Sequence, residues 1–309
     1  MNKFISIIVP VYNSAIFLEK LVQAIDLERK ENKWNLELIL IDDGSKDQSF
    51  KKIQKLVLDY NYIKGIKLSK NFGHQIAVKT GLHESKGEYI AIIDDDLQDP
   101  PKLLPRFFEK LDEGFDVAYG IRKKRKESFI KKFFYISFYR LLKKLSSTDI
   151  QIDSGDFCVM NRKVLNSMLL LQEKNPFLRG IRAWVGFKQI GLEYEREARI
   201  EGESGYTIKK LLKIAFDGIF SFSNVPIRLI TILGTVGLLF ASMYTIVVLF
   251  SYFYQNIEMK GYTSLVIIIS FFSSLILICL GIIGEYIVRI YDEVRNRPYS
   301  VIEETTFGS

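Results

Sequence analysis

The first two hundred residues alternate between short apolar runs and longer segments in which apolar positions have helical spacing. Apolar runs rich in Val, Ile, Leu and Tyr predict buried strands at residues 4–9, 36–41, 66–68, 89–93 and 117–119. Helical spacing predicts helices at 16–27, 50–58 and 76–82, and a further helix beginning at Pro100-Pro101. This alternation predicts an α/β fold with a mostly parallel sheet and helices on both faces.

Polar residues follow three of the predicted strands. Tyr12 and Asn13 follow the first strand, Asp42 and Asp43 end the second, and three aspartates at 94–96 follow the strand at 89–93. Ligands of open α/β sheets bind beyond the carboxyl ends of the strands. We therefore expect these residues, which are far apart in the sequence, to meet in one crevice.

The triplet Asp94, Asp95 and Asp96 is the strongest single chemical signal. Adjacent carboxylates at a strand end repel one another, and a bound cation relieves that repulsion. Carboxylate oxygens suit Mg²⁺ or Mn²⁺, which can also bridge a diphosphate. The alternative is an acidic turn that caps the helix starting at Pro100. The position of the triplet between a strand and a proline-started helix favours the metal site.

The last third of the chain has a different character, because residues 229–254 and 261–284 contain no charged side chain. Roughly 20 helical residues cross the hydrocarbon core of a membrane, so both stretches are long enough. The short segment 255–260 between them predicts a two-helix transmembrane hairpin. Two buried helices of a soluble domain are the alternative, which two long uncharged stretches in succession disfavour.

Charge placement predicts the orientation of this hairpin. The net charge is +7, and basic residues flank its outer ends, with Arg228 before the first stretch and Arg289 after the second. The positive-inside rule then puts both termini on the cytoplasmic side of the plasma membrane. Residues 122–144 are rich in Lys and Arg and contain one acid, Glu127. Because the chain has its own anchor, this patch indicates a membrane surface rather than nucleic acid.

The predicted organisation has four parts. They are a cytoplasmic domain at 1–206, an amphipathic juxtamembrane helix at 207–226, a membrane region at 227–290 and a cytoplasmic tail at 291–309. Basic and apolar residues also mix at 129–145 and 208–220, which predicts helices in the membrane interface, with a solvated surface helix as the alternative. Cys158 and Cys279 fall in different parts, so we expect no disulfide.

Several motifs together resemble the family 2 glycosyltransferases, whose catalytic domain has the Rossmann-like GT-A fold. The motifs are Pro10-Val11-Tyr12-Asn13, Asp42-Asp43-Gly44-Ser45, Asn71-Phe72-Gly73-His74-Gln75, the segment 94–101, Ser154-Gly155-Asp156-Phe157, Arg179-Gly180 and Gly202-Glu203-Ser204. Near the end, Gly284-Glu285-Tyr286 and Arg297-Pro298 are similar to the polyprenyl-phosphate glycosyltransferase branch, which includes bacterial glucosyltransferases and dolichol-phosphate mannose synthases. Each motif is weak alone, but their order and spacing extend over essentially the whole chain.

The resemblance implies a role for each matched residue. It implies a nucleotide pocket formed by Pro10, Tyr12, Asn13, Asp42, Asp43, Asp94 and Asp95. It implies a Mg²⁺ or Mn²⁺ site at Asp94, Asp96 and Gln98, and a general base at Asp156 in a Gly-Asp-Phe turn. It implies phosphate or acceptor contacts by Arg122, Arg125, Arg179, Arg182, Arg199, Ser204 and Tyr206. We expect His74 to be a polar loop residue near the pocket rather than a metal ligand, and leave Trp184 open between core and acceptor site.

The implied activity is an inverting, metal-dependent transfer of a sugar from a nucleotide-sugar donor, UDP-glucose or UDP-N-acetylhexosamine, to undecaprenyl or another polyprenyl phosphate. The product would be a lipid-linked monosaccharide for the cell envelope. A GDP-mannose-dependent mannosyltransferase is the nearest alternative. A processive polysaccharide synthase is disfavoured because two spans make a poor polymer channel, and a non-catalytic nucleotide-sugar-binding membrane protein because the acidic triplet is intact. The expected partners are the donor, the lipid and the membrane, and a homo-oligomer is left open.

Overall fold

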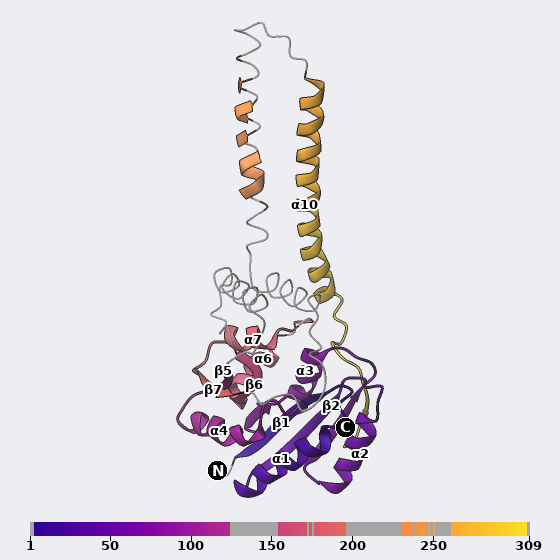
Figure 1. Ribbon diagram of the computed structural model, residues 1–309, viewed down its shortest axis with the longest axis vertical. Coiled ribbons are helices and arrows are strands. Elements are labelled where there is room, and N and C mark those ends of the chain that lie inside the picture. Colours follow the sequence, from indigo (N-terminus) through magenta and orange to yellow (C-terminus); the bar gives the residue numbers. More distant parts are fainter. Residues whose placement is uncertain are drawn as a thin grey trace. The chain divides into compact units, whose positions relative to one another are not determined.

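The computed structural model describes residues 3–123, residues 154–195 except 172 and 175, part of 230–250, and 261–307 (Figure 1). The chain forms two compact units. The first contains residues 1–143, 148–207 and 297–309, and the second contains residues 144–147 and 208–296. The C-terminal tail, expected as a separate segment, thus belongs to the same unit as the N-terminal domain. The basic patch and the two predicted amphipathic stretches lie almost entirely outside the described residues.

The first unit is built around one eight-stranded sheet in the order β7-β5-β6-β4-β1-β2-β3-β8. Its strands are β1 (Phe4–Val11), β2 (Asn35–Asp42), β3 (Ile63–Leu68), β4 (Tyr89–Ile92), β5 (Val117–Lys123), β6 (Ser154–Asn161), β7 (Gln189–Glu195) and β8 (Ile302–Thr305). Its helices are α1 (Leu18–Glu31), α2 (Ser49–Asp59), α3 (His74–Glu84), the short 3₁₀ helix η1 (Pro101–Leu103), α4 (Leu104–Asp112), α6 (Arg162–Leu169) and α7 (Leu178–Trp184). The five strands predicted from the apolar runs are all present.

The sheet is mixed but mostly parallel, as predicted, because β1, β2, β3, β4, β5 and β7 run in one direction and only β6 and β8 run against them. Strand β1 pairs in parallel with β2 and β4, β2 with β3, and β5 with β7. Strand β6 runs antiparallel between β4 and β5, and β8 runs antiparallel to β3. Three strands were not predicted: β6, β7 and β8. Strand β7 alternates polar and apolar residues, β8 has one apolar residue, Ile302, and β6 begins with Ser-Gly-Asp, a sequence typical of a turn.

Helices cover both faces of the sheet, as predicted. Alternate residues of β1, such as Ile5 and Ile7, pack with apolar residues of α1, α2 and α4 in one continuous core. On the other face, Ile8 and Ile41 meet helix α3 at Gly81, where an added Cβ would lie 2.6 Å from each side chain. The absence of a side chain at Gly81 therefore lets α3 approach the middle of the sheet closely.

A buried carboxylate, Glu37, joins three segments of the chain at the end of the sheet that is remote from the acidic triplet. Glu37 of β2 accepts hydrogen bonds from Ser6 Oγ, Lys64 Nζ and the Lys86 backbone N–H, each at 2.6 Å. Burial alone would raise the pKa of Glu37, but these three donors outweigh it and lower the pKa below its ordinary value. The charged form of Glu37 therefore stabilises the fold.

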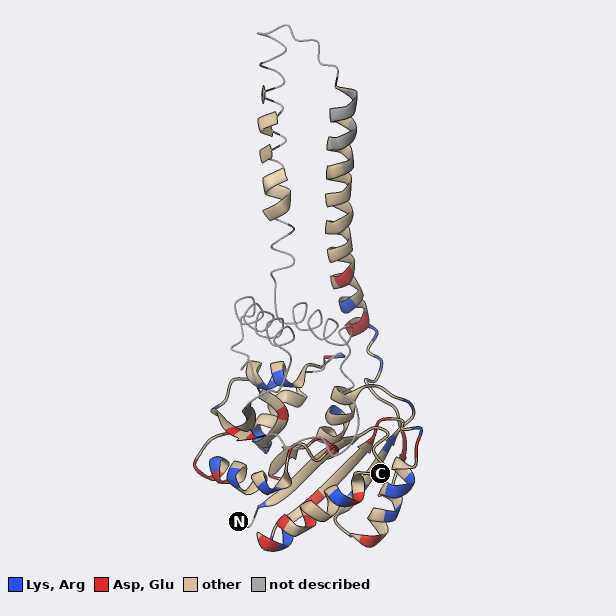
Figure 2. Cartoon of the chain, in the orientation of Figure 1, with Lys and Arg blue, Asp and Glu red and all other residues tan. Residues whose placement is uncertain are grey.

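The second unit contains α10 (Tyr262–Val294). Among the described residues, it is the one helix long and apolar enough to cross a membrane, with the candidate span Phe271–Val294 of mean hydropathy 2.2. Its charged side chains gather near its C-terminal end (Figure 2), where Arg289 pairs with Glu285 at 3.1 Å. A shorter apolar helix, Ile232–Tyr244, lies in the first predicted span and is described only in part.

Replacing Glu37 by Gln should lower the free energy of unfolding by about 2–3 kcal/mol at pH 7, since charged hydrogen-bond partners are lost from a buried position. The pKa of Glu37 is lower in the folded chain than in the unfolded chain. Its stabilisation is therefore complete above the unfolded value and is lost as pH falls through the folded value. Thermal unfolding of both proteins should show a Tm difference at pH 7 that shrinks below about pH 4.

The matched control is Glu113→Gln, which breaks an exposed pair with Lys110 on α4. Its effect should stay within about 0.5 kcal/mol at every pH. If the Tm difference between wild type and Glu37→Gln were the same at every pH, the lost stabilisation would not depend on the charge of Glu37.

Candidate active site

The loops that follow β1, β2 and β4 meet at one edge of the sheet, as the sequence predicted. The Tyr12 backbone N–H donates to Asp95 Oδ2 at 3.4 Å. The Asn13 backbone N–H donates to Ser45 Oγ at 2.9 Å, and the Asp43 backbone N–H donates to the Val11 carbonyl at 2.8 Å. These three strands are neighbours and parallel, so their carboxyl ends deliver the three loops to a common site.

The two aspartates that end β2 have different surroundings. Both are buried, and burial raises the pKa of each. Asp43 accepts hydrogen bonds from the backbone N–H groups of Phe72 and Gly73, at 2.7 and 2.9 Å. Asp42 Oδ1 accepts from the Ser45 backbone N–H at 3.2 Å, whereas Asp42 Oδ2 is a buried oxygen with no hydrogen-bond partner among the described residues. Asp43 thus holds the loop that contains Phe72 and Gly73, whereas one oxygen of Asp42 makes no hydrogen bond within the described residues.

Gly44 allows the loop after β2 to contact the loop after β3. It has φ +65°, and a Cβ at this position would lie 2.4 Å from the Lys70 carbonyl carbon. Any other residue would be strained by the left-handed conformation and would collide with backbone. The Asp-Asp-Gly-Ser motif therefore has a structural reason for its glycine as well as a chemical reason for its aspartates.

The residues at the end of β1 and just after it differ in their exposure to solvent. Pro10 is buried in β1, and Asn13 has φ 52° and accepts from the Lys46 backbone N–H at 2.8 Å through its side-chain oxygen. Tyr12 is 44% exposed. Asn13 is exposed as well, so these two residues of the motif are both accessible from solvent.

The acidic triplet forms the loop between β4 and η1. Burial, together with the charges of Asp99, Asp156 and Asp96, raises the pKa of Asp94 to about 6, against the opposing effect of His74. Burial also raises the pKa of Asp95. Asp96 Oδ1 accepts from the Gln98 backbone N–H at 3.1 Å. The raised pKa values of Asp94 and Asp95 show that burial in this loop disfavours the charged forms of these two carboxylates.

The chemistry of this loop fits a divalent cation. No group of three or more His, Cys, Asp or Glu side chains in the described part of the chain is arranged as a complete metal site. Mg²⁺ does not require one, because it is often held by one or two carboxylates together with water and substrate phosphates. Asp94 and Asp96 would supply hard oxygen ligands, and a cation bound there would offset the burial and the neighbouring negative charges that raise the pKa of Asp94.

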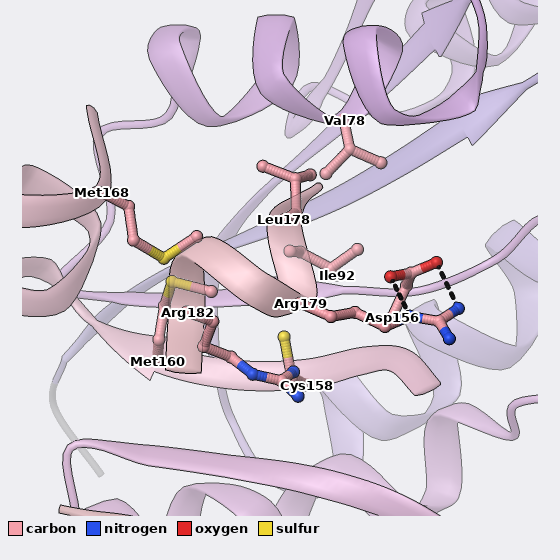
Figure 3. Close-up of a pocket in the computed structure, with 9 residues that line it drawn as sticks. All are labelled: Val78, Ile92, Asp156, Cys158, Met160, Met168, Leu178, Arg179 and Arg182. Atoms are coloured by element: carbon pink, nitrogen blue, oxygen red, sulfur yellow. Dashed lines mark hydrogen bonds and ion pairs between the residues drawn. The ribbon is translucent and has the colours of Figure 1, made fainter. Parts of the chain in front are cut away.

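Asp156 lies in strand β6, which corrects the expected turn. It forms a bidentate ion pair with Arg179 of α7 (Figure 3), with Nε–Oδ1 at 2.7 Å and Nη2–Oδ2 at 2.9 Å. Burial opposes the charged form of Asp156, but the Arg179 guanidinium outweighs it and holds the pKa of Asp156 well below its usual range. Arg179 was predicted as a phosphate contact, and the structure brings it together with the predicted catalytic carboxylate.

His74 lies near the pocket, as expected, and together with Gln75 it begins α3 and makes contacts that the sequence did not predict. His74 Nε2 lies 3.5 Å from Asp156 Oδ2 and 3.7 Å from Asp94 Oδ1, so it connects the acidic loop with β6. Although burial opposes protonation, the two carboxylates raise the pKa of His74 to about 9. Gln75 donates to Asp156 Oδ2 at 3.3 Å and accepts from the Leu178 backbone N–H at 3.0 Å. The motif Asn71-Phe72-Gly73-His74-Gln75 marked these two residues as part of the family resemblance, but it did not indicate which residues they contact.

A small pocket lies beside the Asp156–Arg179 pair (Figure 3). It is lined by Val78, Ile92, Asp156, Cys158, Met160, Met168, Leu178, Arg179 and Arg182. Arg182 is buried, its guanidinium lies 4.8 Å from the centre of the Tyr119 ring, and its Nε has no hydrogen-bond partner among the described residues. Burial raises the pKa of the Cys158 thiol, so this cysteine is neutral in the pocket.

Most of the residues predicted to contact the acceptor lie outside the described part of the chain. Arg125, Arg199, Ser204 and Tyr206 lie outside the described residues, and for Arg122 only its backbone position in β5 is described. Trp184, left open between core and acceptor site, is 59% exposed at the end of α7 and therefore is not a core residue.

The chain is similar to known proteins in both structure and sequence. Among solved structures, the chain is similar to glucosyl-3-phosphoglycerate synthase from Mycobacterium tuberculosis in complex with Mn²⁺, UDP and glucosyl-3-phosphoglycerate. The identity is 17%, with 70% of this chain and 77% of that chain covered and a TM-score of 0.45.

Sequence similarity extends over the full chain. The glycosyltransferase YkcC of Bacillus subtilis (strain 168) is 43% identical over 301 residues, which are 97% of this chain and 93% of that protein. The bactoprenol glucosyl transferase of Shigella phage SfII is 33% identical over 306 residues, 99% of each chain. Residues 6–169, which contain the three converging loops and Asp156, match the family described as glycosyl transferase family 2. The chain therefore belongs to glycosyl transferase family 2, with a GT-A, Rossmann-like domain built on a mixed sheet.

Proposed function

We propose that this enzyme transfers glucose from a nucleoside-diphosphate sugar to the phosphate of a polyprenyl lipid, giving a lipid-linked monosaccharide for the cell envelope. The supporting observation is that similarity to a bactoprenol glucosyl transferase covers 99% of both chains, so that it includes the C-terminal apolar region as well as the sheet. UDP-glucose is the favoured donor. UDP-N-acetylhexosamine and GDP-mannose are the alternatives, because no described contact distinguishes the sugars.

The arrangement of charges suits such a transfer. We propose that Tyr12 and Asp42 contact the nucleotide, because Tyr12 is accessible and Asp42 Oδ2 has an unused acceptor. Asp94 and Asp96, with Gln98 as a further candidate, would hold Mg²⁺ or Mn²⁺. When bound, that cation neutralises charge that develops on the leaving diphosphate. Pro10, Asn13, Asp43 and Asp95 would shape the pocket around these groups.

The acceptor phosphate needs little help to react. Its second pKa is about 6, so at neutral pH it is largely a dianion with a nucleophilic oxygen. One oxygen would form a bond to the anomeric carbon as the bond from that carbon to the diphosphate oxygen breaks, and the diphosphate leaves with the electron pair. Such a single displacement inverts the anomeric centre. Arg179 and Arg182 are the described candidates for holding the acceptor phosphate, together with Arg122, Arg125, Arg199, Ser204 and Tyr206.

The role proposed for Asp156 follows from its ion pair. A carboxylate whose pKa is held well below its usual range by Arg179 is a weak base. The bidentate contact instead supports a role in orienting Arg179, and His74 links the same carboxylate to the acidic loop. We therefore favour Asp156 as the residue that positions the phosphate-binding arginine over Asp156 as a general base.

A two-span membrane topology is also proposed. Strand β8 pairs with β3 inside the first unit, so the chain on both sides of residues 208–296 belongs to one folded body. A chain that leaves and rejoins the same body crosses a membrane an even number of times. If α10 spans the membrane, a second span is needed, and residues 229–254 are the candidate. Arg228 and Arg289 favour a cytoplasmic position for the sheet.

Two other functions fit less well. A processive synthase needs a polymer channel, which two spans do not provide. A non-catalytic nucleotide-sugar-binding protein has no need for the bidentate Asp156–Arg179 pair beside an acidic loop.

Purified full-length protein, supplied with polyprenyl phosphate and a panel of nucleotide sugars, should form a lipid-linked hexose with UDP-glucose. The reaction should require Mg²⁺ or Mn²⁺ and stop in EDTA, because the leaving diphosphate then lacks its neutralising cation. Chromatography of the radiolabelled lipid product measures the transfer. Product formation with GDP-mannose alone would make the enzyme a mannosyltransferase, and no product with any donor would refute the proposed function.

The variants Asp96→Ala and Asp59→Asn sharpen this test. Asp96→Ala should reduce turnover by about 10²-fold or more, as expected when electrostatic stabilisation of the leaving group is lost. Asp59→Asn removes an exposed carboxylate at the end of α2, outside the site, and should leave turnover unchanged. Full activity of Asp96→Ala in the presence of EDTA would exclude the metal role.

The variant Asp156→Asn should reduce turnover by about 10²-fold, because Arg179 loses the partner that orients it. If Asp156 positions Arg179, the ratio of wild-type to variant turnover should stay constant between about pH 5.5 and 8.5, a range that includes the acceptor phosphate pKa of about 6. A ratio that falls as pH rises would instead support the general-base role, since the phosphate then ionises without help. Turnover across this range and donor affinity by calorimetry give the comparison.

Topology can be tested with single cysteines in a variant lacking Cys158 and Cys279. A cysteine at Glu258, between the proposed spans, should react with a membrane-impermeant maleimide in intact cells, whereas a cysteine at Ser309 should react only after lysis. Labelling of Ser309→Cys alone in intact cells would reverse the orientation.

A further inference from the structure

The segment that follows α10 packs against the middle of α3. Within the first unit, Tyr299 stacks on the His83 ring, with centroids 5.5 Å apart and planes 24° apart. The next residue, Ser300, lies with its Oγ 2.9 Å from Thr80 Oγ1. Strand β8 then fixes the segment further, as Ile66 and Thr305 pair between β3 and β8. The chain that leaves the apolar helix is therefore attached to α3 before it joins the sheet.

Lys79 lies at the centre of this contact. Its side chain is 4% exposed, and the ammonium group lies 4.9 Å from the centre of the Tyr299 ring. The same ammonium group donates to the carbonyl oxygens of Glu173 at 2.9 Å and of Leu171 at 3.4 Å. Burying a lysine is costly unless its charge is satisfied, so this cation ties together α3, the Tyr299 ring and the segment that precedes α7.

That segment leads directly to the active site. Residues 171–177 run into α7, whose first residue, Leu178, donates its backbone N–H to Gln75 Oε1. Gln75 donates in turn to Asp156, and Arg179 of α7 holds Asp156 in a bidentate pair. A second contact joins the two chain segments, because Lys174 Nζ donates to the Arg297 carbonyl oxygen. The tail therefore supports both sides of the Asp156–Arg179 pair, through α3 on one side and through the segment before α7 on the other.

We propose that Lys79 and Tyr299 are positioning residues for the transfer reaction: the segment after the apolar helix, seated on Lys79, fixes the start of α7 and thereby the orientation of Arg179 against Asp156. The contacts described above join Lys79 to the segment before α7 and to Tyr299, and the ring of Tyr299 faces the Lys79 ammonium group. This inference rests on the proposed function for its kinetic test only. Its structural consequence, an ordered start of α7, can be measured without a substrate.

The variant Tyr299→Leu in full-length protein should lower kcat by about 10-fold, since small displacements of a catalytic group have effects of this order or larger. The donor KM should stay within about 2-fold of wild type, because the donor contacts are unaffected. Tyr299→Phe keeps the ring over Lys79 and should retain wild-type kcat. Glu303 lies in β8, farther along the same tail, and forms an exposed ion pair with Lys67 of β3. The variant Glu303→Gln breaks this pair and should have no effect on kcat. Equal losses of kcat in Tyr299→Phe and Tyr299→Leu, or no loss in either, would overturn the proposal.

Amide hydrogen exchange distinguishes positioning from general loss of stability. In Tyr299→Leu, exchange should accelerate at Leu178–Trp184 and at the start of α3, while the β1 and β2 amides stay protected as in wild type. Acceleration throughout the sheet would mean that Tyr299 merely stabilises the unit, and unchanged exchange at α7 would mean that the tail does not hold it; either result overturns the proposal. If wild-type protein transferred no sugar, the proposed function would fail, and the exchange experiment would still decide this inference.

Discussion

Crowding of negative charge at one edge of the sheet is the constraint on which this active site depends. The carboxylates gathered there are Asp42, Asp43, Asp94, Asp95, Asp96 and Asp156, delivered by the ends of three parallel strands and by β6. Where burial outweighs the hydrogen bonds and positive charge around a carboxylate, its pKa is raised, as at Asp42. Where Arg179 makes a bidentate contact, the pKa of Asp156 falls instead. The site therefore holds one firmly ionised carboxylate beside several that favour the arrival of further positive charge.

Helix α3 connects the parts of this site. Its first residues, His74 and Gln75, contact Asp156, and its glycine at position 81 lets it lie directly on Ile8 and Ile41 of the central strands. Its middle carries Lys79, which holds the chain before α7. One helix thus connects the sheet to the groups proposed to contact the acceptor, and its buried lysine joins it to the segment before α7.

The return of the chain to the sheet has consequences for membrane attachment. Residues 208–296 leave from and return to the first unit, because residues 297–309 pack within it and β8 extends its sheet. A single hydrophobic tail would have left the C-terminus free. Instead, the end of the apolar helix continues into a segment fixed to α3 and β3, so that the apolar region is tied to the folded domain at both of its ends. For the lipid acceptor proposed above, such double attachment would keep the sheet domain, where the donor is proposed to bind, close to the membrane that holds the lipid phosphate.

The sequence by itself determined the α/β class, five of the eight strands and the meeting of the three polar loops, because apolar periodicity and the carboxyl-end rule for parallel strands are local or topological properties. It also determined the two uncharged stretches. Only the tertiary structure decided that β6 and β8 are antiparallel, because the direction of a strand depends on which neighbours it pairs with and not on its own residues. The same holds for Asp156: the sequence marked it, but its partners Arg179, His74 and Gln75 lie 23 or more residues away along the chain and are brought to it by α3 and α7. Pairwise contacts of this kind set the pKa and the orientation of a side chain, and a linear pattern does not contain them.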